Sequence, residues 1–141
     1  MNREETMRVI ICVDDKNGMT FNRRRQSQDR ILRQDVLEEA GGGKIRMNAY
    51  SAKQFADAAP GQLQVEEEFL EKAGDGDLCF VENRDIVPFE EKIEEIILYR
   101  WNRTYPADTW LQLSFEDWNA AETKEFAGSS HEKITKERYR R

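Results

Sequence analysis

Histidine, cysteine and long apolar runs are scarce in this sequence, and each scarcity excludes a class of protein. The 141 residues contain one histidine, His131, and two cysteines, Cys12 and Cys79. A zinc hydrolase needs several histidine and carboxylate ligands, so the composition argues against one. Both cysteines lie in apolar runs, which is typical of reduced, buried thiols and not of a disulfide framework. No segment approaches the ~20 apolar residues that cross a bilayer, so no membrane partner is expected.

Internal repeats, low-complexity tracts and linkers are absent as well. The length suits a single domain spanning 1–141, and 38% hydrophobic residues are enough to fill one interior. The N-terminal apolar run is short and is followed by no small-residue cleavage site. We therefore expect a cytoplasmic protein.

Charge is plentiful but unevenly distributed. The net charge is −6, yet residues 22–46 hold seven basic and four acidic residues, and 131–141 hold five basic and two acidic ones. Residues 57–95 hold thirteen acidic and three basic residues. Two basic ends around an acidic middle are typical either of solvated faces or of a face that binds an anion.

Apolar periodicity predicts an α/β order of elements. We expect a buried strand at 7–13, an Asn17–Gly18 turn, a helix capped by Ser27 and ended by Gly41–Gly43, and a strand at 44–50 that pairs in parallel with the first. The pattern then predicts a short helix at 65–74, a strand at 77–83 and a helical turn at 87–93. Strands at 94–101 and 118–126 follow, and the tail 128–141 fits either a helix or an edge strand.

In this order, the pieces resemble dihydrofolate reductase. The resemblance rests on "VIICVDDKNGM…DRILRQDVL", "GKIRMNAYSAKQF", "EEFLEKAGDGDLCFVEN" and "IEEIILYRWNRTYPADTWLQ". It implies a single-domain, mostly parallel sheet with antiparallel C-terminal strands, flanked by helices. The segments "NRRRQS", "YRWNR" and "GSSHEKIT" also resemble a family of short uncharacterised bacterial proteins, some of which carry a ribonuclease Z label that the metal-ligand chemistry above does not support.

The phosphate turn departs from the reductase pattern. In those enzymes, a glycine-rich turn at a helix N-terminus binds the pyrophosphate of NADPH. Here the turn reads "VENRDIVPF", which contains no glycine, and Glu82 and Asp85 would repel phosphate. NADPH bound in the usual way is not expected, although a changed binding mode would keep a reductase open as an alternative.

Asp29 and Arg100 each have two interpretations. The resemblance implies that Asp29 takes the place of the carboxylate that binds the pterin ring and helps to deliver a proton, which makes it the catalytic candidate. An acidic residue here also complements the dipole of a helix N-terminus. Arg100 falls where the reductases have a small hydroxyl residue, and we expect it to pair with Asp29 or with an anionic group of a ligand.

The arginine segment, residues 22–30 ("NRRRQSQDR"), supplies most of the candidate ligand site. At a helix N-terminus, the arginines would add their charge to free backbone amides and so hold a phosphate or carboxylate. Arginines can equally neutralise acidic surface nearby. The expected ligand-binding residues are Arg23, Arg24, Arg25, Gln26, Ser27, Asp29, Asn48, Tyr50, Arg100, Asn102 and Arg103.

No metal site and no nucleophilic site is predicted. Asp14–Asp15 and Glu94–Glu95 are neighbours on strands, where successive side chains point to opposite faces and cannot chelate together. His131 follows Ser129 and Ser130 too closely for a nucleophile and its base, so we expect it on the surface or in a cap.

The sequence favours a small-molecule, anion-binding or partner-binding protein over two alternatives. One is an NADPH-dependent pteridine or flavin-type reductase, and the other is RNA binding or processing through arginines interleaved with Tyr99, Trp101 and Tyr105. The negative net charge disfavours nucleic acid. Whether the protein is an enzyme, and its oligomeric state, stay open at this point.

Overall fold

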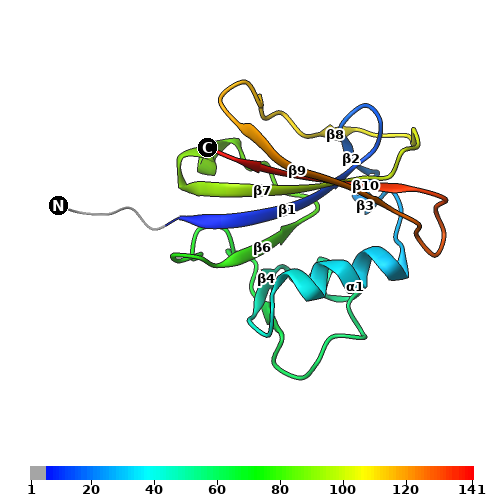
Figure 1. Cartoon of the computed structure of the whole chain (residues 1–141). Coiled ribbons are helices and arrows are strands. Elements are labelled where there is room, and N and C mark those ends of the chain that lie inside the picture. Colours follow the sequence, from blue (N-terminus) through cyan, green and yellow to red (C-terminus); the bar gives the residue numbers. More distant parts are fainter. Residues whose placement is uncertain (1–5) are drawn as a thin grey trace.

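A seven-stranded sheet of mixed orientation forms the centre of the computed structural model, which describes residues 6–141 (Figure 1). The strand order is β5-β4-β6-β1-β7-β10-β9, and the first five of these strands are parallel. β10 is antiparallel to both β7 and β9. The bounds are β1 Met7–Val13, β4 Ile45–Met47, β5 Leu63–Val65, β6 Leu78–Val81, β7 Ile93–Arg100, β9 Asn119–Phe126 and β10 Ile134–Arg140.

Short elements complete the fold. A small antiparallel sheet has the order β3-β2-β8, with bounds Arg24–Arg25, Gly18–Phe21 and Thr109–Trp110. The helices are α1 (Arg30–Glu39), α2 (Ala49–Ala52) and a 3₁₀ helix, η1 (Val87–Lys92). Figure 1 shows α1 beneath the large sheet and the small sheet above its right-hand end. Among the described residues, no helix has the length and apolarity needed to cross a membrane.

Both faces of the central strands are covered, which explains their nearly continuous apolar sequences. Side chains of β1 alternate between two cores: Val9 and Ile11 pack on one face, and Ile10 packs on the other with Leu32 and Val36 of α1. α1 ends where the chain turns to positive φ at Gly41 and Gly42, a conformation that favours glycine.

Most of the expected elements are confirmed, but four details are wrong. The strand expected at 44–50 ends at Met47, because Ala49 and Tyr50 already belong to α2. Ser27 does not cap α1, because the side chain of Asp29 accepts the first-turn hydrogen bonds instead. β4 does not pair with β1, since β6 lies between them. Residues 65–74 form turns and not a helix. Val65 belongs to β5, Glu66 N donates to Met47 O, and residues 67–72 form turns.

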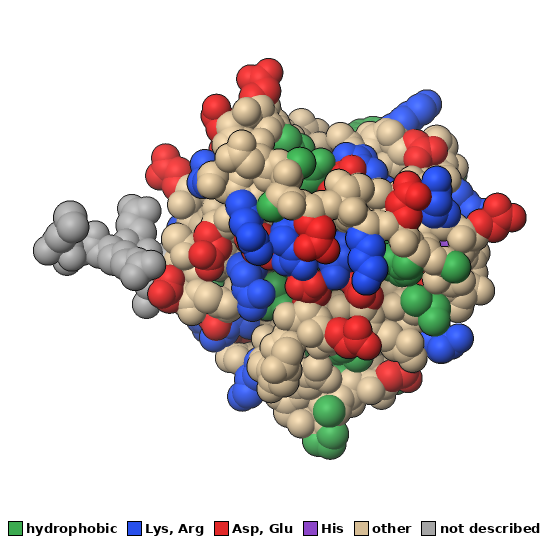
Figure 2. Space-filling model, viewed as in Figure 1, with side chains coloured by type: hydrophobic (Ala, Val, Ile, Leu, Met, Phe, Trp, Pro, Cys, Tyr) green, Lys and Arg blue, Asp and Glu red, His purple; other side chains and the backbone are tan. Residues whose placement is uncertain are grey.

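The tail, which fitted a helix or a strand, forms β10, and its basic residues are paired. Lys136 contacts Asp35 and Glu39 of α1 at 2.7 and 2.6 Å. Arg138 binds Glu39 and also Glu95 of β7. Figure 2 shows the Lys and Arg side chains over the middle of this face interleaved with Asp and Glu. The positive charge of β10 is therefore largely neutralised within the fold.

Truncation in the central strands tests this arrangement. Ile97 of β7 is fully buried and lies between β1 and β10. We expect Ile97→Ala to lower the free energy of unfolding by about 2–5 kcal/mol, because it opens a cavity in a close-packed core. Glu94→Ala, in the same strand but exposed, should change it by less than about 0.5 kcal/mol. Urea denaturation measures both, and equal effects would contradict the placement of β7.

Candidate functional site

The carboxyl ends of the parallel strands meet at one edge of the sheet, which is where open α/β sheets bind ligands. β1 is followed there by Asp14, β4 by Asn48, β6 by Glu82 and β7 by Trp101. The β2–β3 hairpin and the residues that lead from it into α1 lie over this edge, as the following contacts show.

Arg25 closes the edge. Its guanidinium binds Glu82 through two hydrogen bonds of 2.9 and 3.2 Å and lies over the ring of Tyr50, 4.4 Å from its centre. The hydroxyl of Tyr50 accepts a hydrogen bond from Arg25 N at 2.9 Å. These contacts keep the pKa of Arg25 above its ordinary value, since the attraction of Glu82 outweighs the effect of burial, which lowers it. The cavity left beneath is only about 10 Å³, and its lining residues are Cys12, Met19, Arg25, Gln26, Ser27, Glu82 and Trp101.

Asp14 holds the hairpin from its other side. This buried carboxylate accepts hydrogen bonds from Lys16 N, Gly18 N, Tyr105 N and the side-chain amide of Gln26, at 2.7–3.1 Å. Burial raises the pKa of Asp14, but these hydrogen bonds to the charged form outweigh it, so the pKa lies below its ordinary value. Asp14 is therefore an ionised structural anchor.

Asp29 ties α1 to the loop before β10. Besides capping the helix, its buried carboxylate accepts hydrogen bonds from Ser129 N and Ser130 N at 3.0 and 2.8 Å. Burial raises the pKa of Asp29, but the hydrogen bonds from the loop and the helix dominate and hold it well below its ordinary value. Gly128 permits this approach, because a Cβ at that position would lie 2.4 Å from a carboxylate oxygen of Asp29.

His131 is buried in the same network, so the expectation of a surface position is wrong. Its Nδ1 lies 3.2 Å from Oδ2 of Asp29, and its Nε2 lies 3.2 Å from Oγ of Ser27 and 3.0 Å from the hydroxyl of Tyr105. The ring stacks on Trp101 with 4.6 Å between centres. The backbone amides of its own loop reach Asp29, and this draws the ring inward.

An open cleft lies beside the closed edge. Its volume is about 340 Å³, and its lining residues are Phe21, Asn22, Arg24, Arg25, Gln26, Tyr105 and Pro106. Within the described residues, the guanidinium of Arg24 makes no ion pair or hydrogen bond. The side-chain oxygen of Gln26 is buried and also has no hydrogen-bond partner. The cleft therefore has the unpaired guanidinium of Arg24 on its wall.

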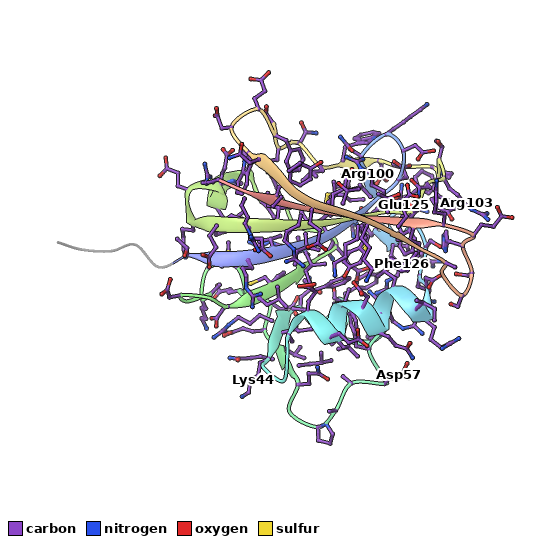
Figure 3. All side chains as sticks on the ribbon, viewed as in Figure 1. Lys44, Asp57, Arg100, Arg103, Glu125 and Phe126 are labelled. Atoms are coloured by element: carbon purple, nitrogen blue, oxygen red, sulfur yellow. The ribbon has the colours of Figure 1, made fainter. Side chains whose placement is uncertain are left out.

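Arg100 lies on the other face of the sheet, so its expected pairing with Asp29 is wrong. Because side chains alternate along β7, Tyr99 faces α1 and Arg100 faces away from it. Figure 3 shows Arg100 above the sheet and α1 below. The guanidinium binds Glu137 at 2.7 Å and the side chain of Asn17 at 3.2 Å.

The remaining predicted residues are dispersed around the edge. Asn102 donates to Lys133 O and Thr135 Oγ1, away from the cleft. Arg103 and Arg23 are exposed and are not among the lining residues of the cleft. Asn48 caps α2 and donates to Asn83 at 2.8 Å. The structure thus brings together Arg24, Arg25, Gln26, Ser27 and Tyr50, and links Asp29 to them through His131.

The residues after β6 do not fit the pyrophosphate of a nicotinamide cofactor. Glu82 places a carboxylate there, Arg84 is held by Glu71 at 2.7 Å, and Ala49 N at the start of α2 donates to Glu67. α2 has only four residues. No backbone cradle for phosphate is therefore offered at the position where the reductases have one. Among the described residues, no group of three His, Cys, Asp or Glu side chains could hold a metal ion.

Comparison with known proteins identifies the fold. No family model matches the sequence, and no curated protein matches it. Among solved structures, the chain is similar to a dihydrofolate reductase from Enterococcus faecalis complexed with NADP(H) and RAB-propyl, with a TM-score of 0.69. The match covers 96% of each chain at 9% sequence identity. The fold is thus that of dihydrofolate reductase.

We expect Asp14 and Asp29 to make the protein sensitive to acid. The stability that they contribute is present above about pH 4, the pKa of aspartate in an unfolded chain, and is lost as the pH falls through their depressed folded pKa values. Urea unfolding between about pH 2 and 6 should show a flatter acid limb in Asp29→Asn than in the native chain. Asp57→Asn, at an exposed position, is the control, and an unchanged limb in Asp29→Asn would contradict the assignment.

A double-mutant cycle tests the closure of the edge by Arg25. Because Glu82 is 9% exposed in this pair, Arg25→Ala leaves a nearly buried carboxylate without its partner. We expect Arg25→Ala and Glu82→Ala to be non-additive, with a coupling of about 1–3 kcal/mol in denaturation experiments. The more exposed pair Arg84–Glu71 is the control and should couple by at most about 1 kcal/mol. Additive effects at Arg25 and Glu82 would show that the pair does not hold the hairpin.

Proposed function

We propose that this protein binds a small anionic molecule in the cleft between the β2–β3 hairpin and Tyr105. The observation that carries the proposal is the unpaired guanidinium of Arg24 on the wall of a cleft of about 340 Å³. Clefts for small molecules start at about 300 Å³, so the volume suits a compact ligand. The planar guanidinium suits a carboxylate or phosphate, which it can bind through two hydrogen bonds.

The walls of the cleft add one further requirement for the ligand. Phe21, which is 46% exposed, Tyr105 and Pro106 offer apolar surface on which a flat ring can pack. A ligand with one anionic group and one ring satisfies both features.

The two alternative functions have less support in the geometry. A reductase needs a place for its cofactor, and Glu82 and Arg84 occupy the phosphate turn with side-chain ion pairs. RNA binding would use Arg24 with Phe21 and Tyr105 as a stacking platform, but the net charge of −6 opposes a polyanion. A small monoanionic or dianionic ligand meets much less of this opposition.

Titration with 4-aminobenzoate and 4-hydroxyphenyl phosphate, followed by ¹⁵N–¹H NMR, tests the proposal. We expect shifts at Asn22, Arg24 and Gln26, and about tenfold weaker binding in Arg24→Ala, which corresponds to ~1.4 kcal/mol. Arg30→Ala removes the same charge from an exposed position outside the cleft and should bind like the native chain.

Three results, one from this titration and two from separate assays, would contradict the proposal. Equal affinity of Arg24→Ala and the native chain would show that the cleft is not the site. Salt-dependent retention of single-stranded oligouridylate without binding of either small probe would support RNA instead. If the absorbance of NADPH fell when a pterin was added with the protein, this would support the pteridine reductase alternative.

A further inference from the structure

Ser27, His131 and Asp29 form a hydrogen-bonded chain whose parts come from distant segments. Ser27 and Asp29 lie just before the first residue of α1. His131 comes more than 100 residues later, in the loop before β10. Oγ of Ser27 lies 3.2 Å from Nε2, and Oδ2 of Asp29 lies 3.2 Å from Nδ1. A hydroxyl, an imidazole and a buried carboxylate in this order are the groups that activate a serine nucleophile.

The tautomer of His131 follows from its neighbours. Nδ1 lies 3.2 Å from Oδ2 of Asp29 and 3.1 Å from Oγ of Ser130. The Ser130 hydroxyl donates to Gln28 O or to Asp29, and a carboxylate can only accept, so Nδ1 carries the proton in the neutral ring. Nε2 is then left as an acceptor, and it faces the hydroxyls of Ser27 and Tyr105. Trp101, stacked on the ring at 4.6 Å, fixes its plane. The imidazole is thereby oriented to take a proton from Ser27.

Two further features favour chemistry at Ser27. Its hydroxyl has no hydrogen-bond partner besides His131 within the described residues, and it shares the lone pair of Nε2 with the hydroxyl of Tyr105. The backbone N–H groups of Ser27 and Gln28 make no hydrogen bond within the same residues, and they precede the N-terminus of the ten-residue helix α1. Free amides next to a nucleophile are the donors that stabilise an oxyanion.

We propose that Ser27 is the nucleophile of an acyl-transfer site that hydrolyses small carboxylic esters, with His131 as general base and Asp29 as its positioning residue. Ser27 lines the closed cavity of about 10 Å³. Arg25 and Gln26 line both this cavity and the open cleft. Tyr105 lines the open cleft, and its hydroxyl contacts Nε2 of His131. Arg25 and Gln26 therefore separate Ser27 from the open cleft, and an ester reaches Ser27 when the Arg25 side chain moves aside. This site goes beyond the anion binding proposed above and does not depend on Arg24.

The reaction balances with water as the co-reactant. Oγ of Ser27 forms a bond to the ester carbonyl carbon while Nε2 of His131 takes the hydroxyl proton. The bond to the leaving alcohol then breaks, and His131 returns that proton to the alcohol oxygen. Water cleaves the acyl-serine in the same way and releases the acid. Once Nε2 is protonated, Tyr105 loses its acceptor there, and its O–H becomes free to donate to the oxyanion.

A fluorophosphonate probe tests the nucleophile without knowledge of the natural substrate, because it reacts with activated serines. In the folded, full-length protein we expect a covalent adduct on Ser27 by peptide mass spectrometry, and no adduct in Ser27→Ala. Ser114→Ala, in an exposed loop, should label like the native chain. Hydrolysis of p-nitrophenyl acetate should fall at least ~100-fold in Ser27→Ala and not in Ser114→Ala.

Arg25 covers Ser27 and could block the probe, so the labelling is repeated in Glu82→Gln. This variant weakens the ion pair that holds Arg25 in place. Absence of an adduct on Ser27 in both the native protein and folded Glu82→Gln overturns the proposal. An adduct on Tyr105 in place of Ser27 overturns it as well. Either result leaves anion binding at Arg24 untouched, so failure of this site and failure of the proposed function are distinguishable.

The tautomer gives a second test, because His131 is the single histidine and its ring resonances need no further assignment. In ¹⁵N-histidine-labelled protein we expect a protonated Nδ1 and an unprotonated Nε2. Asp29→Asn should alter this state, because an amide can donate to Nδ1 where a carboxylate cannot. Urea unfolding confirms that the variant is folded. A proton on Nε2 in the native protein would remove the general base and with it the proposal.

Discussion

The buried carboxylate of Asp29 is the interaction on which the site depends. It accepts hydrogen bonds from Ile31 N and Leu32 N of α1 and from Ser129 N and Ser130 N of the loop before β10. A helix cap alone contributes about 1 kcal/mol, and hydrogen bonds to a charged group contribute about 1.5–3 kcal/mol each. One side chain therefore fixes both the start of a helix and the start of an edge-proximal strand.

The other acidic groups at this edge are satisfied in the same internal way. Asp14 collects amide donors from its own turn and from Gln26, and Glu82 is held by Arg25. None of the three carboxylates is left to bind a cationic or amino-substituted ring. The chain has the fold of dihydrofolate reductase, and the residues that line its open cleft include two arginines and two aromatic rings.

The sequence predicts the fold better than the site, for physical reasons. Strand β1 has the expected bounds, because a β-branched apolar run can be buried on both faces of a sheet and little else explains it. The sequence could also have predicted that Arg100 lies on the face of the sheet away from α1. Side chains alternate along a strand, so Arg100 faces the opposite way from its neighbours Tyr99 and Trp101. The contact between Asp29 and His131 was not, because it spans 102 positions and local spacing carries no sign of it. Gly128 is the one sequence feature that this contact explains. A side chain at that position would collide with the carboxylate of Asp29, which only the structure shows.

Composition also cannot distinguish the two basic segments, which serve opposite purposes. In β10, Lys136 and Arg138 meet Asp35 and Glu39 of α1 across the surface of the sheet, so their charge holds the helix in place. In the hairpin, Arg24 follows Asn22 and Arg23, whose positive φ values form the turn, and its guanidinium makes no ion pair or hydrogen bond within the described residues. Coulomb attraction between exposed charges is largely screened beyond about 8–10 Å in physiological salt. Only groups within that range therefore decide whether a cationic side chain is paired. Whether each arginine or lysine is paired is thus decided by the local geometry of its segment and not by the net charge of the chain.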